Sequence, residues 1–266
     1  MQKAFHENHG LQCGFCTPGF VMSMFALYQQ DSAPNREQVN VALGGNLCRC
    51  TGYRPIIDAA LVSCTGTPQD KFSQHQAGTI AKLNALPNSD AGLDTLFMPT
   101  NRNELAATIK ATPTARLFAG STDIALEVTQ QLKSLPTLVS LTQVKELQVV
   151  EETSSGLKIG AAVPFSKMEA LLLKHFPSLH ELLDRFASTP IRNQATLGGN
   201  VANASPIGDM PPALLALNAV IKVDNGTTRR DIAISDFFTG YRQTRLQNDE
   251  WIEAIFIPYL KPNAQV

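Results

Sequence analysis

The sequence has 266 residues, a formal net charge of −1 and 44% hydrophobic residues, which is enough for two domains with apolar cores. The near-zero net charge gives no electrostatic reason to expect nucleic acid or an anionic membrane as a partner. No apolar run reaches the length of a membrane span, no secretory signal precedes the cysteines, and five cysteines do not indicate a secreted disulfide framework. We therefore expect a cytoplasmic protein.

Four cysteines near the N-terminus form two close pairs, Cys13 with Cys16 and Cys48 with Cys50. The spacing is C-x2-C followed by C-x-C, and four thiolates make a soft, sulfur-only ligand set. Such a set suits an iron–sulfur cluster, with zinc as the alternative. Structural zinc sites usually separate the two ligands of each pair by two or more residues. The single-residue gap between Cys48 and Cys50 therefore favours iron and sulfide.

Other interpretations of the cysteines stay open. Four unrelated buried cysteines would behave as small hydrophobes, and His6 or His9 could enter a mixed His/Cys cluster. Cys64 is left over, and we interpret it as a core residue of a helix.

Short helices are predicted around these cysteines. Residues 1–12 end a helix, Thr17-Pro18 starts the next, Asn35 and Gln38 form a capping box, Gly44-Gly45 is a stop, and Arg54-Pro55 opens another helix. Cys16 and the Cys48–Cys50 pair then precede helix N-termini, which favour an anionic cluster. Residues 65–92 are polar and rich in turn formers, which predicts a linker with a short helix around residues 72–86.

From Leu96 onward strands and helices alternate. Strands are predicted at 96–98, 115–118 and 138–141, with helices beginning after Asn101 and at Ile124. This order implies a parallel sheet with helical crossovers. The junction from Gly120 to Asp123 suits a phosphate group, since glycine allows close backbone approach, but it is not G-x-G-x-x-G and an ordinary turn is the alternative.

The second half begins with a predicted hairpin of 147–150 and 157–160, followed by helices from Val163 and Ser178 and a later strand at 251–257. Residues 195–209 are too irregular for a helix and too glycine-rich for a plain strand, so we predict a loop. Its hydrogen-bonding side chains beside glycines suit an extended polar cofactor.

Several phrases resemble the molybdenum hydroxylase family, which includes xanthine dehydrogenase and aldehyde oxidase. Residues 12–19 and 45–55 resemble its second 2Fe–2S domain, and residues 117–124 and 195–209 resemble its two FAD-contacting segments. The sequence segments 192–209, 236–242 and 251–257 look most like those of the small 2Fe–2S/FAD subunits of bacterial xanthine dehydrogenases. The resemblance also implies that the sequence is truncated at both ends relative to the family, so we expect this chain alone to bind FAD weakly or not at all.

The resemblance implies an α+β protein. Residues 1–64 would form a small helical bundle that holds the 2Fe–2S cluster, and 65–92 would be a linker. Residues 93–266 would form a mixed α/β FAD-binding domain of the molybdenum-hydroxylase flavoprotein (PCMH) type, with subdomains at 93–145 and 146–260.

Site residues are carried over from the same resemblance. Gln12 would touch the pterin, and Tyr241 and Phe186 would lie near the flavin or nicotinamide, with core packing as the alternative for both aromatics. The cluster ligands would be Cys13, Cys16, Cys48 and Cys50. The FAD contacts would be Leu117, Phe118, Ala119, Gly120, Ser121, Thr122, Asp123, Ile124, Phe186, Ala187, Thr196, Gly199, Asn200, Asn203, Ser205, Asp209 and Ile252.

The implied activity is that of an oxidoreductase component that is not catalytically complete alone. It would pass electrons from a molybdenum site through the 2Fe–2S cluster to FAD and on to NAD, most nearly as in xanthine dehydrogenase and purine catabolism. The implied partners are a large subunit with molybdopterin and a separate plant-type 2Fe–2S domain, in a higher-order heteromer. The alternatives are an aldehyde oxidase or carbon monoxide dehydrogenase relative, and a non-enzymatic, zinc-stapled nucleotide-binding scaffold.

Overall fold

The computed structural model describes residues 1–30, 33–66, 68–86 and 95–261. The chain divides into two compact units, one of residues 1–89 with 187–190 and one of residues 90–186 with 191–266. The parts of the predicted linker at residue 67 and residues 87–92, the predicted domain start at 93–94, and residues 262–266 lie outside the described residues. Across the described ranges, no helix combines the length and apolarity needed to cross a membrane.

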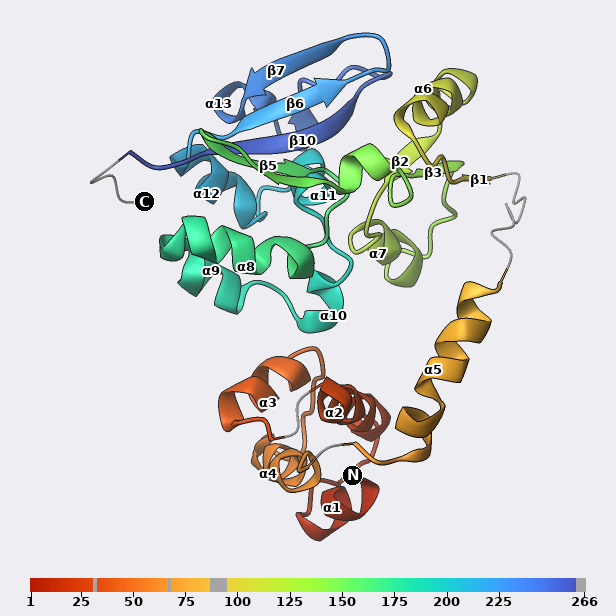
Figure 1. Ribbon diagram of the computed structural model, residues 1–266, viewed down its shortest axis with the longest axis vertical. Helices are drawn as coiled ribbons and strands as arrows, with labels where there is room; N and C mark the ends of the chain where they lie inside the picture. The colour runs from red at the N-terminus through yellow and green to blue at the C-terminus, as the bar shows by residue number, and fades with distance from the viewer. Residues whose placement is uncertain (31–32, 67, 87–94, 262–266) are drawn as a thin grey trace. The chain divides into compact units, whose positions relative to one another are not determined.

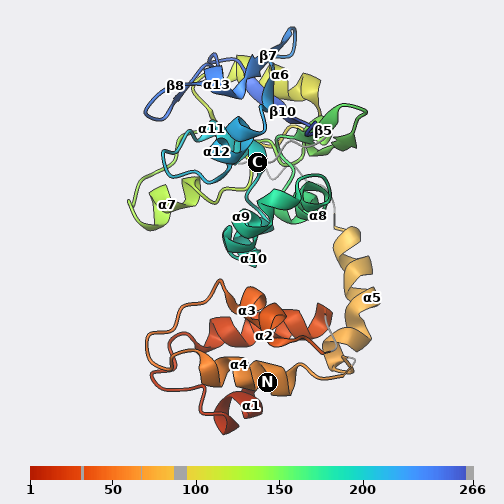
Figure 2. The same ribbon diagram turned by 90° about the vertical axis from the view of Figure 1, so that its left-hand side faces the viewer.

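The first unit is a small helical bundle (Figure 2). It contains α1 (Gln2–Glu7), α2 (Thr17–Gln30), α3 (Arg36–Leu43) and α4 (Arg54–Ser63), and then α5 (Lys71–Asn84). The predicted capping box is present, because Asn35 Oδ1 accepts from the Gln38 N–H at 2.9 Å and the Asn35 N–H donates to Gln38 Oε1 at 2.8 Å. Cys64 is fully buried against Met24, as expected of a core residue.

A parallel three-stranded sheet begins the second unit (Figure 1). Its strands are β1 (Leu96–Phe97), β2 (Arg116–Phe118) and β3 (Leu138–Ser140), in the order β1-β3-β2. The crossovers contain α6 (Arg102–Ala111) and α7 (Ile124–Thr129). This confirms the predicted parallel sheet with helical crossovers.

An antiparallel five-stranded sheet follows, in the order β4-β5-β10-β6-β7. Its strands are β4 (Val150–Glu152), β5 (Gly156–Gly160), β6 (Val220–Asp224), β7 (Arg229–Ala233) and β10 (Trp251–Pro258). The register places Ile255 between Ile159 and Ile221, and all three are fully buried. A short two-stranded sheet of β8 (Phe238–Gly240) and β9 (Gln243–Thr244) lies outside it.

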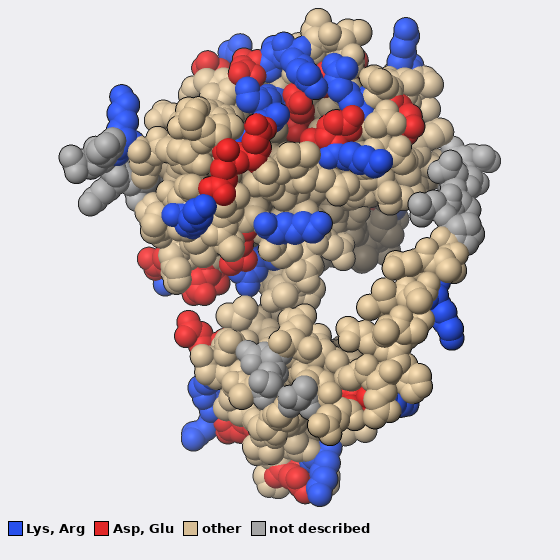
Figure 3. All heavy atoms as spheres, viewed as in Figure 1, with Lys and Arg blue, Asp and Glu red and all other residues tan. Residues whose placement is uncertain are grey.

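Helices cover one face of the five-stranded sheet (Figure 1). They are α8 (Phe165–His175), α9 (His180–Arg185), α11 (Leu197–Ala202) and α12 (Met210–Ala216); η2 (Pro177–Leu179), α10 (Thr189–Arg192) and α13 (Ile234–Phe237) complete the second half. Basic and acidic side chains are interspersed over the part of the unit near β6 and β7 (Figure 3), where Lys222 pairs with Asp231 and Arg230 pairs with Glu250.

The structure corrects two predicted elements. The first strand of the hairpin lies at β4, whereas residues 145–148 form a 3-10 turn (η1, Lys145–Gln148). The predicted loop at 195–209 contains helix α11, because Thr196 Oγ1 caps its start by accepting from the Gly199 N–H at 3.0 Å. This N-cap and the burial of Leu197, Gly198 and Val201 together offset the low helix propensity of the two glycines.

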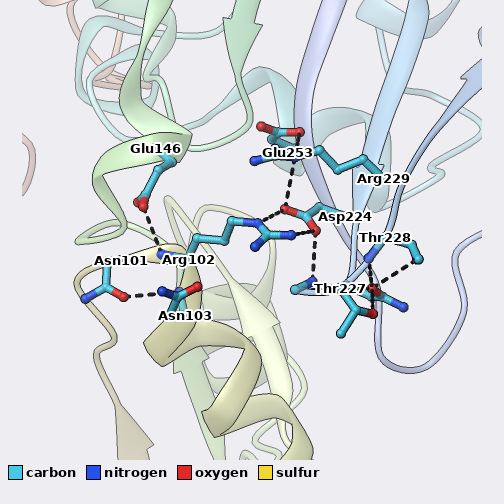
Figure 4. A network of polar contacts seen from close by, with 11 residues as sticks. Asn101, Arg102, Asn103, Glu146, Asp224, Thr227, Thr228, Arg229 and Glu253 are labelled. Atoms are coloured by element: carbon cyan, nitrogen blue, oxygen red, sulfur yellow. Dashed lines mark hydrogen bonds and ion pairs between the residues drawn. The ribbon is translucent and has the colours of Figure 1, made fainter.

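An ion pair joins the two sheets of the second unit (Figure 4). Arg102 at the start of α6 donates two hydrogen bonds to Asp224 at the end of β6, at 2.6 and 2.8 Å. Asp224 also accepts from the Gly226 N–H at 2.8 Å, and its side chain is 1% exposed. Burial raises the pKa of this carboxyl, but Arg102 and the Gly226 N–H outweigh burial and leave the pKa lowered.

We predict that Asp224→Asn destabilises the second unit by about 3–5 kcal/mol, because it leaves a partly buried guanidinium without its charge partner. The matched variant is Asp231→Asn, which breaks the exposed pair with Lys222 and costs about 1 kcal/mol or less. Denaturant unfolding of both variants measures the difference.

The same comparison has a pH readout. Because the folded-state pKa of Asp224 is lowered, its contribution is complete above the unfolded pKa of about 3.9 and is lost as pH falls through the lower folded value. The difference in free energy of unfolding between wild type and Asp224→Asn should therefore become smaller only in strong acid. If Asp224→Asn and Asp231→Asn were equally stable near neutral pH, the stabilising role assigned to the Arg102–Asp224 ion pair would be contradicted.

Candidate cofactor sites

The four paired cysteines lie on two neighbouring loops of the first unit. Cys16 directly precedes α2, and the loop of Cys48 and Cys50 precedes α4, as predicted. Gln12 ties the loops together, since its Nε2 donates to the Cys50 carbonyl at 3.0 Å. The sulfurs of Cys13 and Cys50 lie 3.5 Å apart.

The thiols differ in their surroundings. Cys48 is buried, and its pKa is lowered to about 7 by the Thr51 hydroxyl, 3.2 Å from its sulfur, and by the N–H groups of Thr51 and Cys50. The Phe15 N–H and the Cys50 thiol lower the pKa of Cys13. Burial and the hydrogen bond with Cys48 raise the pKa of Cys16, and donation to Cys13 raises that of Cys50. Each pair thus contains one thiol whose pKa is lowered and one whose pKa is raised.

These contacts divide the sulfurs into Cys13 with Cys50 and Cys16 with Cys48. Among the described residues, no three His, Cys, Asp or Glu side chains converge on one point as ligands of a single metal ion, and His6 and His9 join no such group. A 2Fe–2S centre takes two protein ligands on each iron. The donor set and its pairing therefore fit a two-iron cluster.

A polar cavity of about 590 Å³ lies in the second unit between the β2–α7 loop and α11. This volume falls within the range of about 300–1,000 Å³ typical of ligand pockets. Of the predicted FAD contacts, those lining it are Leu117, Phe118, Ala119, Gly120, Ser121, Thr122, Asp123, Ile124, Phe186, Thr196, Gly199, Asn200, Asn203, Ser205 and Asp209.

Two predicted contacts and one predicted aromatic lie elsewhere. Ile252 is buried in the core of the five-stranded sheet, and neither it nor Ala187 lines the cavity. Tyr241 lines an adjoining, more apolar pocket of about 510 Å³ and is 76% exposed, so core packing is wrong for Tyr241. Phe186 both packs on Phe165, with ring centroids 4.4 Å apart, and lines the polar cavity.

Seven lining residues were not named individually from the sequence. Ala195, Ala202, Ile207 and Gly208 lie within the predicted FAD-contacting segment 195–209, whereas Arg116, Ile191 and Arg242 lie outside both predicted segments. Arg116 directly precedes the predicted loop, and its position on β2 could have indicated it. Arg242 comes from the β8–β9 turn, where its backbone has a φ of 52° and its Nη1 lies 3.5 Å from Asn203 Oδ1. The resemblance at residues 236–242 indicates this turn through Tyr241, but it does not single out Arg242.

The β2–α7 loop packs closely against the backbone at Gln194 in the second half of the unit. A Cβ added to Gly120 would overlap the carbonyl oxygen of Gln194, so only glycine fits there. Ser121 follows with a φ of 61°. A second cavity of about 460 Å³ shares residues 118–121 and Thr196 with the first, and adds polar groups from Ser140, Asn193 and Lys167.

Asn200 supplies a test of whether a polar ligand fits. It lines the first cavity, and its Oδ1 is buried without a hydrogen-bond partner among the described residues. A buried acceptor left unpaired is costly, which favours a bound group that donates to it. With the close-packed glycine loop and two cavities that share part of their lining, these residues fit an extended, polar dinucleotide.

Comparison with known proteins agrees with both sites. Residues 1–61 match the family described as the 2Fe-2S binding domain, and residues 89–260 match the FAD binding domain in molybdopterin dehydrogenase. The chain therefore pairs an iron–sulfur domain with a flavin-binding domain. The chain belongs to the molybdenum hydroxylase family, and the match to that family's FAD-binding domain covers most of this chain.

Similar curated proteins are xanthine dehydrogenases. Xanthine dehydrogenase 2 of Arabidopsis thaliana is 31% identical over 98% of this chain and 24% of its own length. Xanthine dehydrogenase/oxidase of Mus musculus is also 31% identical, over 97% of this chain and 23% of its own length. The chain thus spans about a quarter of the length of these relatives.

Solved structures share the fold. Quinoline 2-oxidoreductase from Pseudomonas putida 86 is 27% identical, with a TM-score of 0.58 over 62% of this chain and 59% of that chain. Reconstituted CO dehydrogenase from Oligotropha carboxidovorans is 25% identical, with a TM-score of 0.58 over 66% of this chain and 61% of that chain.

We predict that Gly120→Ala destabilises the second unit by about 1–3 kcal/mol, because the new methyl group cannot be accommodated against the Gln194 backbone. Gly208→Ala is the matched variant in the same cavity wall, where the added atom would meet its nearest neighbours at 3.3–3.5 Å. Thermal unfolding should show a clear loss for the first variant and little change for the second. Similar stability of both would show that the loop does not depend on this contact.

Proposed function

We propose that Cys13, Cys16, Cys48 and Cys50 hold a 2Fe–2S cluster, with Cys13 and Cys50 on one iron and Cys16 and Cys48 on the other. The observation that carries this proposal is the meeting of the two cysteine loops, where the sulfurs of Cys13 and Cys50 lie 3.5 Å apart and Gln12 links the loops. The cluster, when bound, supplies a one-electron carrier. The protein's part is to hold four thiolates in place and to donate N–H and hydroxyl hydrogen bonds to them.

We further propose that FAD occupies the polar cavity. The backbone of residues 117–124 would face its pyrophosphate, since Gly120 permits close approach there. Asn200 would accept a hydrogen bond from the cofactor, and Phe186 would offer an apolar surface to the ring. The second cavity gives an extended cofactor further room. The roles of Ala187, Ile252 and Tyr241 stay predictions that rest on the resemblance.

The chain would then be the electron-transfer part of a molybdenum hydroxylase, most nearly of the xanthine dehydrogenase type with NAD as acceptor. About 30% identity to xanthine dehydrogenases along nearly the whole chain supports that branch. The structural likeness to quinoline 2-oxidoreductase and CO dehydrogenase keeps their branches as the second candidate.

The partner would be a subunit that carries molybdopterin and determines the substrate. Gln12 would lie at that interface, near the pterin, while its Nε2 links the two cysteine loops. We place the assembly, a higher-order heteromer with a further plant-type 2Fe–2S domain, in the reducing cytoplasm, where thiolate ligands persist. A zinc-stapled scaffold is the remaining alternative, and metal analysis separates it from the cluster.

We predict that Cys13→Ala and Cys48→Ala each abolish the cluster, because each removes one of only two protein ligands on an iron. Iron and acid-labile sulfide analysis, with electron paramagnetic resonance (EPR) spectra of dithionite-reduced protein, measures the loss. Cys64→Ala is the control, since Cys64 lies in the core of the helical unit. Full iron content in both ligand variants would overturn the ligand assignment.

We predict that Asn200→Ala weakens FAD binding about tenfold, the effect of losing one hydrogen bond of about 1.4 kcal/mol. The stability of the FAD-free protein should not fall, because the substitution removes an unpaired buried acceptor. Titration with quenching of FAD fluorescence measures affinity, and Asn103→Ala on the exposed face of α6 is the control. Unchanged affinity in Asn200→Ala would place FAD outside this cavity.

A further inference from the structure

Three residues beside the most buried cysteine form a closed ring of hydrogen bonds. The Cys48 N–H donates to the Tyr53 hydroxyl at 3.0 Å, and the Tyr53 N–H donates to Thr51 Oγ1 at 3.2 Å. Thr51 Oγ1 in turn lies 3.2 Å from the sulfur of Cys48. The backbone of Tyr53 has a φ of 68° and follows Gly52, whose φ is 69°. This left-handed turn brings the Tyr53 N–H back onto Thr51.

The ring constrains the hydrogen bonds of the Thr51 hydroxyl. A hydroxyl has one proton to donate and two lone pairs to accept with. Thr51 Oγ1 accepts from the Tyr53 N–H with one lone pair, and beside a Cys48 thiol either Oγ1 or the sulfur could donate the remaining hydrogen bond. A metal-bound thiolate has no proton, so in the loaded protein Thr51 is the donor.

We propose that the Thr51 hydroxyl raises the reduction potential of the 2Fe–2S cluster by donating a hydrogen bond to the Cys48 sulfur. Reduction adds one negative charge to the cluster, and donors to its sulfurs stabilise the more negative state. The inference rests on the proposed cluster ligands and concerns a tuning residue that binds no iron itself. Cys48 is 9% exposed, so this hydrogen bond competes little with water.

Thr51 is the side chain that distinguishes the two pairs of ligands. Cys13 and Cys50 are both exposed to solvent, where water can hydrogen-bond their sulfurs. Cys48 is buried and receives a side-chain hydroxyl together with the N–H groups of Thr51 and Cys50. A change at Thr51 therefore alters a sulfur that solvent reaches poorly.

The test is an EPR-monitored redox titration of Thr51→Val in the full chain. Valine keeps the shape of threonine and removes the hydroxyl, both as donor to the Cys48 sulfur and as acceptor from the Tyr53 N–H. The equilibrium constant for reduction should fall about tenfold, which corresponds to a midpoint potential about 59 mV lower for one electron. Thr51→Ser keeps the hydroxyl and should stay close to wild type. Thr65→Val, an exposed position beyond α4, is the matched control and should show no shift.

Iron and labile sulfide content separate the outcomes. A Thr51→Val protein that holds a full cluster at the wild-type potential would overturn the inference and leave the cluster assignment intact. Wild-type protein without iron would overturn the proposed cluster itself. If Thr51→Val and the smaller Thr51→Ala both fold but bind no iron, Thr51 is needed for assembly and the tuning role is wrong.

Discussion

The cavity of the second unit depends on the close approach of Gly120 to the carbonyl of Gln194. Gly120 belongs to the parallel three-stranded part, and Gln194 precedes α11 in the part built on the five-stranded sheet. The contact brings the β2–α7 loop to the start of α11, so that loop and helix line one space. A side chain at position 120 would force them apart. The pair of Arg102 and the buried Asp224 joins the same two parts at another point.

The first unit has a different constraint, because it must hold four thiolates close together. Like charges this near one another repel, and the fold relieves the repulsion with donors aimed at the sulfurs. Cys13 receives the Phe15 N–H, and Cys48 receives the Thr51 hydroxyl with two N–H groups. Metal-bound thiolates keep such donors, which then act on the electronics of the centre. The same hydrogen bonds thus favour the ligand set and influence its reduction potential.

Much of this was predictable where chemistry is local. Three features are set by residues close together in the sequence. They are the two cysteine pairs (Cys13 with Cys16, Cys48 with Cys50), the capping box at Asn35 and the strand–glycine–helix junction at Gly120. The helix at 197–202 was missed because a cap from Thr196, together with burial of the helix, offsets two glycines. Strands β6 and β7 also went unpredicted; β7 pairs with its sequence neighbour β6, and β6 is placed in the sheet by a long-range pairing with β10. The place of Arg242 beside the cavity has the same origin.

The central claim is that this chain holds a two-iron cluster and an FAD site in separate units. The most direct measurement is the content of iron, acid-labile sulfide, zinc and bound flavin per chain in protein purified without oxygen and supplied with FAD. The account predicts two iron and two sulfide per chain and no stoichiometric zinc. It also predicts bound FAD whose affinity falls when residues of the polar cavity are substituted. One zinc per chain with no sulfide would contradict it and leave the zinc-stapled scaffold as the explanation.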